Sequence, residues 1–347
     1  MSIKRLTVTD FIEGMPGALV LDVRSPGEYS HAHIPGASSL PLFTDEERSV
    51  VGTTYKQKGR QAAIKLGLDY FGPEMRKMVE QVEQWLQEGN QKKILIHCWR
   101  GGMRSGAVAW LLDLYGFDLY VLEGGYKAFR NWVLDQFQKD YPLRLIGGYT
   151  GSGKTHVLHQ LQKAGAATID LEGLANHRGS AFGALDRPGQ PSAEFFENKL
   201  ALELHRLAST EQTIWIEDES QRIGDINIPI AFWNLMRTKP LYFLEVPFGE
   251  RLGLLVKDYG HFKKEAMVNA IIRIKKRLGG LDAKEAIHAL VEDDLRSCFA
   301  ILLRYYDKQY SKSLNGRNNL GKLIRRVATD TADAQTNTKK ILNHAGE

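Results

Sequence analysis

The sequence predicts an α/β protein with two domains, each a parallel β-sheet covered by helices, and a helical C-terminal part. Short apolar runs alternate with longer amphipathic ones along the chain, which is the pattern of strands joined by helical crossovers. The 347 residues are enough for two cores of about 150 residues each. The only cysteines, Cys98 and Cys298, are too few for a disulfide scaffold or a cysteine zinc site.

The first series of elements lies in the N-terminal part of the chain. Residues 18–24, 92–98 and 118–125 are short apolar runs and predict strands. Residues 73–89 and 103–116 have apolar residues at helical spacing and end at a glycine, so they predict helices.

The second series begins with an apolar strand at residues 142–148, which a helix at 154–165 follows directly. Two further apolar runs, at 212–220 and 239–247, predict strands. From Phe248 onward the pattern is mainly helical and rich in lysine and arginine. This alternation again predicts a parallel sheet, extended by helices at the C-terminal side.

The domain boundary is expected in a polar helix over residues 129–142, which Pro142 ends. The predicted domains are therefore residues 1–137 and 138–347. No internal repeat or low-complexity tract divides the chain further.

The chain carries a net charge of +5 and has a pI near 9.0. This modest excess is compatible with a polyanionic partner such as nucleic acid, and equally with a merely soluble surface. The N-terminus has no apolar segment typical of a signal peptide, and no window approaches the about 18 apolar residues of a membrane span. We therefore expect a cytoplasmic protein without membrane segments.

The first chemical motif is a loop between the strand that ends at Cys98 and the helix that begins near Met103. Backbone N–H groups at such a helix start surround the sulfur as an anion-binding nest. Arg100 and Arg104 add positive charge, which favours the thiolate and predicts a nucleophilic Cys98. The alternative is a small buried cysteine at a strand end, but such a cysteine does not call for two adjacent arginines.

The second motif, "GYTGSGKT", follows an apolar strand and precedes a helix, as a phosphate-binding P-loop does. Its backbone N–H groups predict a diphosphate site, with Lys154 at the terminal oxygens and Thr155 as a magnesium ligand. The predicted diphosphate-binding residues are Gly148, Gly151, Ser152, Gly153, Lys154 and Thr155.

Acidic residues at the end of the next strand are candidates for a second magnesium ligand. Glu217, Asp218 and Glu219 stand where a carboxylate faces the P-loop in P-loop proteins, and we assign Asp218 to this role beside Thr155. The alternative is a solvated strand end, which is common in α/β proteins.

Two further polar segments are candidates for contacts with a substrate or with a nucleic acid. The first is a loop around His177, whose own alternative is a structural histidine. The second is the basic amphipathic helix at residues 261–280, whose charges are spaced to neutralise phosphates or simply to form a solvated face. The candidate contact residues are Asn176, His177, Arg178, Ser180, Lys275, Lys276 and Arg277.

Residues 21–41, "LDVRSPGEYSHAHIPGASSLP", together with the cysteine loop resemble the rhodanese domain over about residues 8–137. The resemblance implies a rhodanese-like fold with an active cysteine. Cys98 and Arg104 enclose five residues, whereas rhodaneses usually have four. Five is the spacing of cysteine-dependent phosphatases and makes a wider nest. Asp22 and Arg24 are expected either to stabilise this nest or to form a surface ion pair.

A rhodanese-like domain followed by a P-loop domain, with "HCWRGGMRSG", "GYTGSGKT" and "DLEGLANHRGSAFG" in this order, resembles the tRNA 2-selenouridine synthase family along essentially the whole chain. The resemblance implies a bacterial enzyme that replaces sulfur by selenium at position 2 of the wobble uridine of tRNA, with selenophosphate as the donor. It also implies an S-geranyl intermediate made from geranyl diphosphate.

The resemblance further implies how the two domains share this chemistry. Cys98 would carry selenium as S-selanylcysteine, with Arg100 and Arg104 binding the selenophosphate oxyanion. The P-loop would hold geranyl diphosphate with magnesium, since a P-loop recognises phosphate oxygens and not the organic group. The helical C-terminal part would bind tRNA, and an enzyme that supplies selenophosphate is an expected partner.

Two other functions remain open from the sequence. The first is a P-loop kinase or ATPase with a regulatory rhodanese domain, which predicts ATP turnover that depends on Lys154. The second is a rhodanese-fold cysteine phosphatase, which predicts a phosphoryl intermediate on Cys98.

Overall fold

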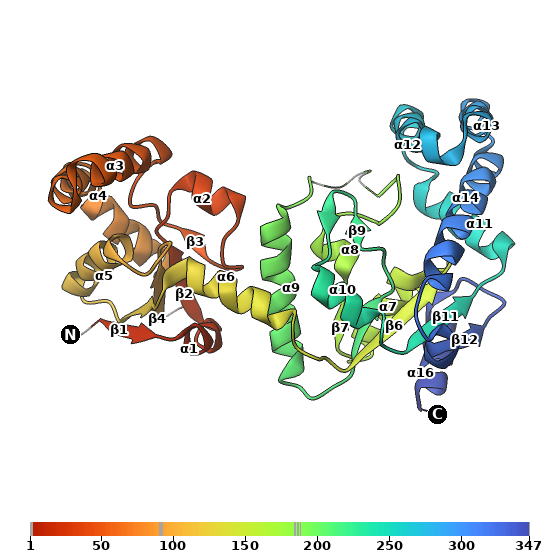
Figure 1. Ribbon diagram of the computed structural model, residues 1–347, viewed down its shortest axis with the longest axis horizontal. Helices are drawn as coiled ribbons and strands as arrows, with labels where there is room; N and C mark the ends of the chain where they lie inside the picture. Colours follow the sequence, from red (N-terminus) through yellow and green to blue (C-terminus); the bar gives the residue numbers. More distant parts are fainter. Residues whose placement is uncertain (1–2, 90–92, 184, 186, 188, 347) are drawn as a thin grey trace. The chain divides into compact units, whose positions relative to one another are not determined.

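The computed structural model describes residues 3–89, 93–183, 185, 187 and 189–346 (Figure 1). The chain divides into two compact units, Met1–Gln136 and Phe137–Glu347. Each unit contains a five-stranded parallel sheet, so the predicted α/β fold class is confirmed. Lys92, the first residue of one predicted strand, lies outside the described residues.

In the first unit, β4 is the central strand of the five-stranded sheet (Figure 1). All its pairings are parallel. In spatial order, the strands are β1 (Lys4–Leu6), β5 (Leu119–Leu122), β4 (Lys93–His97), β2 (Ala18–Asp22) and β3 (Ser38–Ser39). The helices are α1 (Val8–Glu13), α2 (Pro26–His31), α3 (Asp45–Lys58), α4 (Arg60–Gly89), α5 (Met103–Tyr115) and α6 (Gly125–Gln136).

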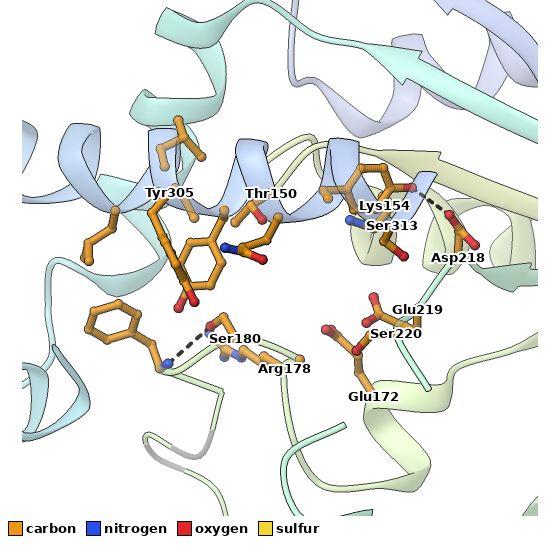
Figure 2. Close-up of a pocket in the computed structure, with 18 of the residues that line it drawn as sticks. Thr150, Lys154, Glu172, Arg178, Ser180, Asp218, Glu219, Ser220, Tyr305 and Ser313 are labelled. Carbon is orange, nitrogen blue, oxygen red and sulfur yellow. Dashed lines mark hydrogen bonds between the residues drawn. The ribbon is translucent and has the colours of Figure 1, made fainter. Parts of the chain in front are cut away.

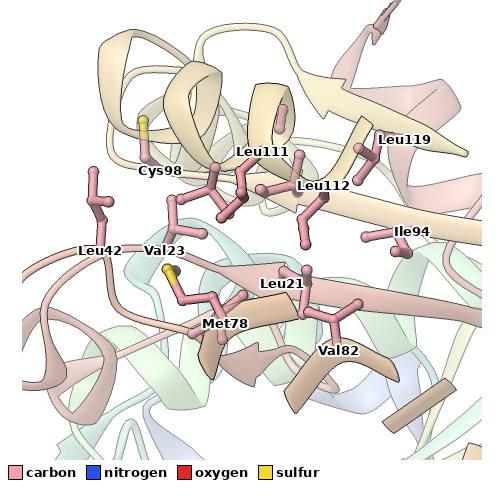
Figure 3. Packing of buried hydrophobic residues seen from close by; sticks show 14 of the residues in the cluster. Leu21, Val23, Leu42, Met78, Val82, Ile94, Cys98, Leu111, Leu112 and Leu119 are labelled. Carbon is pink, nitrogen blue, oxygen red and sulfur yellow. The ribbon is translucent and has the colours of Figure 1, made fainter. Parts of the chain in front are cut away.

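The core of this unit forms where α4 and α5 cover one face of the sheet. Figure 3 shows Leu21 and Ile94 of the sheet packed between Val82 of α4 and Leu112 of α5. These side chains are almost entirely buried, and Cys98 lies at the edge of the same cluster. Packing of apolar faces therefore fixes the strand that presents Cys98.

Helix α4 is longer than the sequence predicts. We expected a helix that starts at Pro73, but α4 begins at Arg60 and passes through the proline. Ala63, Gly67 and Phe71 are buried one helical turn apart, so the apolar stripe of the helix extends before Pro73. Burial of this stripe outweighs the backbone hydrogen bond that a proline removes.

The sheet of the second unit places β6, which precedes the P-loop, between β11 and β8. All its pairings are parallel as well. In spatial order, the strands are β12 (Ile324–Ala328), β11 (Leu241–Glu245), β6 (Leu143–Gly148), β8 (Ile214–Glu217) and β7 (Thr168–Ile169). A small antiparallel pair is formed by β9 (Arg222–Ile223) and β10 (Ile226–Asn227).

The helices of the second unit make two groups. Some cover the sheet, with α7 and α16 packing against one of its faces: α7 (Lys154–Lys163), α8 (Leu171–Leu174), α9 (Ala193–Ala208), α10 (Ile230–Met236), α15 (Leu320–Leu323) and α16 (Ala334–Gly346). The others form a helical group with its own apolar core: α11 (Phe248–Tyr259), α12 (Lys264–Leu278), α13 (Gly280–Val291) and α14 (Leu295–Asn315). None of the described helices combines the length and hydrophobicity of a membrane span.

Candidate active sites of the two units

The cysteine loop lies at the carboxyl end of β4, where the chain turns into α5. Cys98 is only 2% exposed, and its Sγ lies 3.3 Å from Oγ of Ser105, in the first turn of α5. The backbone N–H groups of Arg100 and Ser105 also point to the sulfur. The loop thus surrounds Cys98 with hydrogen-bond donors, as the sequence predicts.

These donors lower the pKa of the Cys98 thiol. Burial raises the pKa, but the hydrogen bonds from Ser105 and from the Arg100 N–H, together with the charge of Arg104, lower it more. A lower pKa increases the thiolate fraction at neutral pH, and the thiolate is the nucleophilic form. The surroundings of Cys98 therefore suit a reactive cysteine.

Both arginines of the loop were expected to add positive charge beside the sulfur, but only Arg104 does so in the structure. Arg104 is anchored by Glu28 of α2, with 2.6 Å between Nη1 and Oε2, so its charge is shared with a carboxylate. The side chain of Arg100 is exposed, and this residue reaches the sulfur through its backbone N–H. Of the two guanidinium groups, that of Arg104 acts on the thiolate by charge, and Glu28 holds it in place.

Asp22 and Arg24 form a buried ion pair, so the alternative of a surface ion pair is wrong. Both side chains are at most 1% exposed, and Nη2 of Arg24 lies 2.6 Å from Oδ2 of Asp22. Arg24 also stacks over the ring of Tyr126, 3.8 Å from its centroid. The backbone N–H of Tyr126 donates to the carbonyl of Cys98. The buried pair of Asp22 and Arg24 therefore contacts the cysteine loop through Tyr126.

The P-loop lies at the carboxyl end of β6 and leads into α7. Gly151 has a φ of +78°, and a Cβ there would lie 2.8 Å from the carbonyl of Arg251, so only glycine fits. Arg251 in turn donates to the carbonyl of Thr150 at 3.1 Å and pairs with Asp307 of α14. Lys154 donates to the carbonyl of Gly148 at 3.1 Å, which holds its ammonium group inside the loop.

The carboxylate beside Thr155 is Glu172 and not the predicted Asp218. The Thr155 hydroxyl donates to Oε2 of Glu172 at 3.2 Å. Asp218 instead accepts a hydrogen bond from Tyr310 at 2.7 Å and forms an ion pair with Arg317. Tyr310 of α14 and Arg317, which follows α14, thus occupy both oxygens of Asp218, and its role as a magnesium ligand stays a prediction.

Glu172 belongs to a group of buried carboxyl groups around the P-loop. Burial raises its pKa to about 8, and the neighbouring Glu219 adds to the shift, while Lys154 opposes it. Burial and the charge of Glu172 also raise the pKa of Glu217, which is fully buried. The Thr155 side chain lowers the pKa of Glu217, but burial and the neighbouring carboxyl groups prevail. Such a concentration of carboxyl groups is stabilised by positive charge, from Lys154 or from a cation.

A cavity of about 470 Å³ opens beside the P-loop. Figure 2 shows Lys154, Asp218 and Glu219 near one end of the cavity, and Arg178 and Ser180 on the loop below α14. Part of the wall is apolar: Leu255 lies against Gly151 of the P-loop, and Phe182, Tyr259 and Phe299 add aromatic rings. The cavity thus joins a phosphate-binding loop to an apolar region.

The predicted polar loop contributes only part of its residues to this cavity. Arg178 and Ser180 line it, but His177 is 8% exposed and accepts a hydrogen bond from the Gly179 N–H. Asn176 contacts the carbonyl of Gly189 and does not line the cavity. The contacts of His177 and Asn176 thus hold the loop in shape.

The basic helix α12 points most of its charges outward. Lys275, Lys276 and Arg277 are all exposed, and among these Arg277 also lines the cavity. A positive surface therefore adjoins the cavity, an arrangement compatible with binding a polyanion at this site.

Several residues of the two sites were not found from the sequence. Ser105 and Glu28 act on the cysteine loop, whereas Glu172, Tyr310 and Arg317 act on the P-loop site. For Glu172 there was a signal, because it stands in the first turn after the strand β7, at the same sheet edge as the P-loop. Tyr310 and Arg317 are distant in sequence, and only the fold brings them together.

Comparisons with known proteins match both units. The family description "tRNA 2-selenouridine synthase AAA domain" matches residues 141–338, and "Rhodanese-like domain" matches residues 7–131. The tRNA 2-selenouridine synthase of Aeromonas salmonicida is 36% identical over 341 residues, which cover 88% of this chain and 89% of the relative. The tRNA 2-selenouridine synthase of Shewanella sediminis is 35% identical, with 88% and 90% covered.

The chain belongs to the tRNA 2-selenouridine synthase family. The first unit is its rhodanese-like domain, and the second unit is its AAA domain, which carries the P-loop. The relatives are named as enzymes that act on tRNA, so the predicted enzyme class is confirmed at this level. The structure of this family member thus has one candidate site in each domain.

Proposed function

We propose that the protein converts 2-thiouridine at the wobble position of tRNA to 2-selenouridine, through an S-geranyl intermediate. The observation that carries the proposal is the cavity of the AAA domain, which joins Lys154 of the P-loop to an apolar wall. A diphosphate with a hydrocarbon chain suits such a cavity, because the diphosphate can bind the P-loop and the hydrocarbon chain can pack on the apolar wall. Geranyl diphosphate belongs to this class.

In the first step, the sulfur of 2-thiouridine bonds to C1 of the geranyl group while the bond from C1 to the diphosphate oxygen breaks. Diphosphate leaves, and the N3 proton of the uridine is lost to solvent. Lys154 and the P-loop N–H groups stabilise the charge that develops on the diphosphate. Thr155 and Glu172 are the residues that would hold a magnesium ion here, and the ion would supply further positive charge to the leaving diphosphate.

In the second step, selenium replaces the alkylated sulfur. Alkylation makes the sulfur a better leaving group, because geranyl thiolate departs from C2. In the proposed route, the Cys98 thiolate attacks the selenium of selenophosphate and forms an S-selanyl adduct, while the Se–P electron pair leaves with phosphorus as phosphite. The terminal selenium then bonds to C2 as geranyl thiolate leaves, and two equivalents of a cellular thiol reduce the S–Se bond and free Cys98. The alternative is direct attack of selenophosphate on C2, after which water cleaves the Se–P bond and releases phosphate.

The contacts to tRNA are assigned to the surface beside the cavity. Arg178, Ser180 and Arg277 line the cavity, and Lys275 and Lys276 lie exposed on the same helix as Arg277. These charges suit the phosphates of the anticodon loop. A cytoplasmic location and an enzyme that supplies selenophosphate complete the proposal.

The test compares Lys154→Ala with Lys163→Ala, a control on the exposed last turn of the same helix α7. Purified variants receive 2-thiouridine tRNA and geranyl diphosphate, and nucleoside mass spectrometry measures geranylated uridine. Lys154→Ala is expected to lose at least a hundredfold in geranylation, because its charge stabilises the leaving diphosphate. Lys163→Ala is expected to match the wild type.

The same variants are then given tRNA that is already geranylated, together with selenophosphate. Lys154→Ala is expected to form 2-selenouridine at the wild-type rate, because the Cys98 site is in the other domain. Normal geranylation by Lys154→Ala, combined with a selenium step that depends on ATP, would instead identify a nucleotide site and support the kinase or ATPase alternative.

A further inference from the structure

The apolar end of the cavity is closed by three aromatic side chains that touch one another. The ring centroids of Phe182 and Phe299 are 5.8 Å apart, those of Phe182 and Tyr259 are 5.9 Å apart, and those of Tyr259 and Phe299 are 6.2 Å apart. All three residues line the cavity and are at most 8% exposed. We call these residues the aromatic floor.

The aromatic floor is held rigidly from several directions. The hydroxyl of Tyr306 on α14 accepts a hydrogen bond from the Ala181 N–H at 3.0 Å, which fixes the loop that carries Phe182. Arg178 lies over the ring of Tyr259, 5.6 Å from its centroid. Behind the floor is the apolar core of α11–α14. The rings are therefore held in place by the packed core on the side away from the cavity.

Helix α14 contributes residues both beside the P-loop and in the aromatic floor. The Tyr310 hydroxyl accepts a weak hydrogen bond from the Gly148 N–H at 3.5 Å, and Lys154 lies 5.8 Å from its ring centroid. Phe299 stands on the same helix, three turns before Tyr310. At 1.5 Å per residue, these two positions are separated by about 16 Å along the helix axis. The cavity is thus bounded at both ends by residues of one rigid element.

We propose that the aromatic floor sets the length of the prenyl chain that this protein transfers. The inference rests on the proposed function, in which the P-loop holds the diphosphate. With the diphosphate fixed at one end, only the hydrocarbon end can vary. A chain with one more isoprene unit than geranyl would overlap the ring of Phe299, whereas a shorter chain would leave apolar wall uncovered.

The test measures kcat/KM for geranyl diphosphate and for farnesyl diphosphate, with 2-thiouridine tRNA as the acceptor. The wild type is compared with Phe299→Ala and with the milder Phe299→Leu, which keeps more of the core filled. The control is Phe232→Ala. Phe232 is equally buried in the same unit, packs on Phe137 and Tyr141, and does not line the cavity.

The wild type is expected to prefer geranyl diphosphate. In Phe299→Ala the ratio of kcat/KM for farnesyl to that for geranyl diphosphate is expected to rise at least tenfold, because loss of the ring opens space of about one isoprene unit. Phe299→Leu is expected to raise the ratio less, and Phe232→Ala should leave it unchanged.

An unchanged ratio in both Phe299 variants, with geranylation still measurable, would overturn the role of the aromatic floor. Should Phe299→Ala fail to fold in thermal unfolding, Phe299→Leu alone decides between the two results. A wild type that transfers neither prenyl group would refute the proposed function itself. The two failures are therefore distinguishable.

Discussion

The two cysteines are both buried, but their surroundings shift the pKa values of their thiols in opposite directions. Hydrogen bonds and the charge of Arg104 overcome the effect of burial at Cys98 and lower its pKa. At Cys298 burial dominates, the charge of Asp294 adds to it, and the pKa rises to about 11. Cys298 lies on α14 among the apolar residues of the helical core. Only Cys98 is therefore suited to react as a thiolate.

Replacement of Cys98 by alanine is expected to abolish selenium incorporation and to leave S-geranylation intact. The reason is that selenium is carried by Cys98 in the proposed second step, whereas geranylation is proposed to take place at the P-loop of the other domain. Mass spectrometry of tRNA nucleosides measures both products. The control is Cys298→Ala, which we expect to keep both activities and to lose about 1 to 2 kcal/mol of stability.

An alanine variant of Cys98 that forms 2-selenouridine at the wild-type rate would show that selenophosphate attacks C2 directly, without Cys98. A phosphoryl group found on Cys98 after incubation with a phosphate ester would support the phosphatase alternative. Loss of both activities in a folded Cys298→Ala protein would contradict the structural role of Cys298.

His97 precedes Cys98 and is fully buried beside the pair of Asp22 and Arg24. Burial is the main cause that lowers its pKa to about 4; the charge of Asp22 opposes the shift, and Arg24 and His33 add to it. The folded protein therefore keeps His97 neutral at pH values where an unfolded chain would protonate it. Asp22, whose pKa is also lowered, shifts stability in the same direction at lower pH.

The rhodanese-like domain is expected to lose stability as the pH falls below about 6.5. The folded-state pKa of His97 is below its unfolded value, so its contribution is complete above the unfolded pKa and decreases until the folded pKa is reached. Between pH 6.5 and pH 5 the loss is on the order of 2 kcal/mol. Urea unfolding at each pH, monitored by hydrogen exchange of the β4 amides, measures this loss of stability.

His97→Gln removes the titrating group and should flatten this pH dependence. His31→Gln, at an exposed position of α2, is the matched control and should retain it. Equal slopes in all three proteins would show that His97 does not determine the pH response.

Among the structural elements, the start of α6 shapes the cysteine loop. Gly125 has a φ of +60°, and a Cβ there would lie 2.4 Å from the carbonyl oxygen of Cys98 and from the N–H nitrogen of Gly101. The two segments touch through their backbones, so no side chain can move aside to make room. Helix α6 thus fixes the loop by direct backbone contact.

Gly125→Ala is expected to distort the cysteine loop and to reduce selenium incorporation at least tenfold, with geranylation unchanged. Gly106→Ala is the control, because Gly106 lies inside α5 and a Cβ there meets nothing within 4 Å. The rate of 2-selenouridine formation from geranylated tRNA measures the effect. A Gly125→Ala protein with normal selenium transfer would show that the contact is dispensable.

Elements with strong local signals were predictable from the sequence. The strands β2, β4 and β6 and the helices α5 and α7 have the predicted type within a few residues, because each combines a clear apolar period with a glycine or a loop motif. The strand β12 was missed. Its residues "IRRVA" include two arginines and are half exposed at the sheet edge, so they resemble the basic helical segments around them.

The sites were predictable only where their residues are close in the sequence. The cysteine loop and the P-loop are continuous segments, and their backbones have the expected form. The pairing of Thr155 with Glu172, and that of Asp218 with Arg317, depend on tertiary contacts. The aromatic floor combines Phe182, Tyr259 and Phe299 from three segments, and no local pattern distinguishes them from ordinary core residues.

At the scale of the whole molecule, both candidate sites use the same property of parallel sheets. In each unit a central strand ends at the loop that carries the chemistry, β4 at Cys98 and β6 at the P-loop. All strands of a parallel sheet end at one edge, so loops from neighbouring strands can act together there. Two such edges on one chain provide one candidate site for each of the two proposed steps.

The edge strand β12 has a consequence for how the protein is made. It pairs with β11 along five residues, yet the helices α11 to α14 separate the two strands in the sequence. During synthesis the second unit has a hydrophobic strand, β11, with an open hydrogen-bonding edge until Ile324–Ala328 emerge from the ribosome. Open edges of this kind pair with other chains, so a polypeptide cut short before Ile324 would aggregate even though every residue of the P-loop and of the cysteine loop is present.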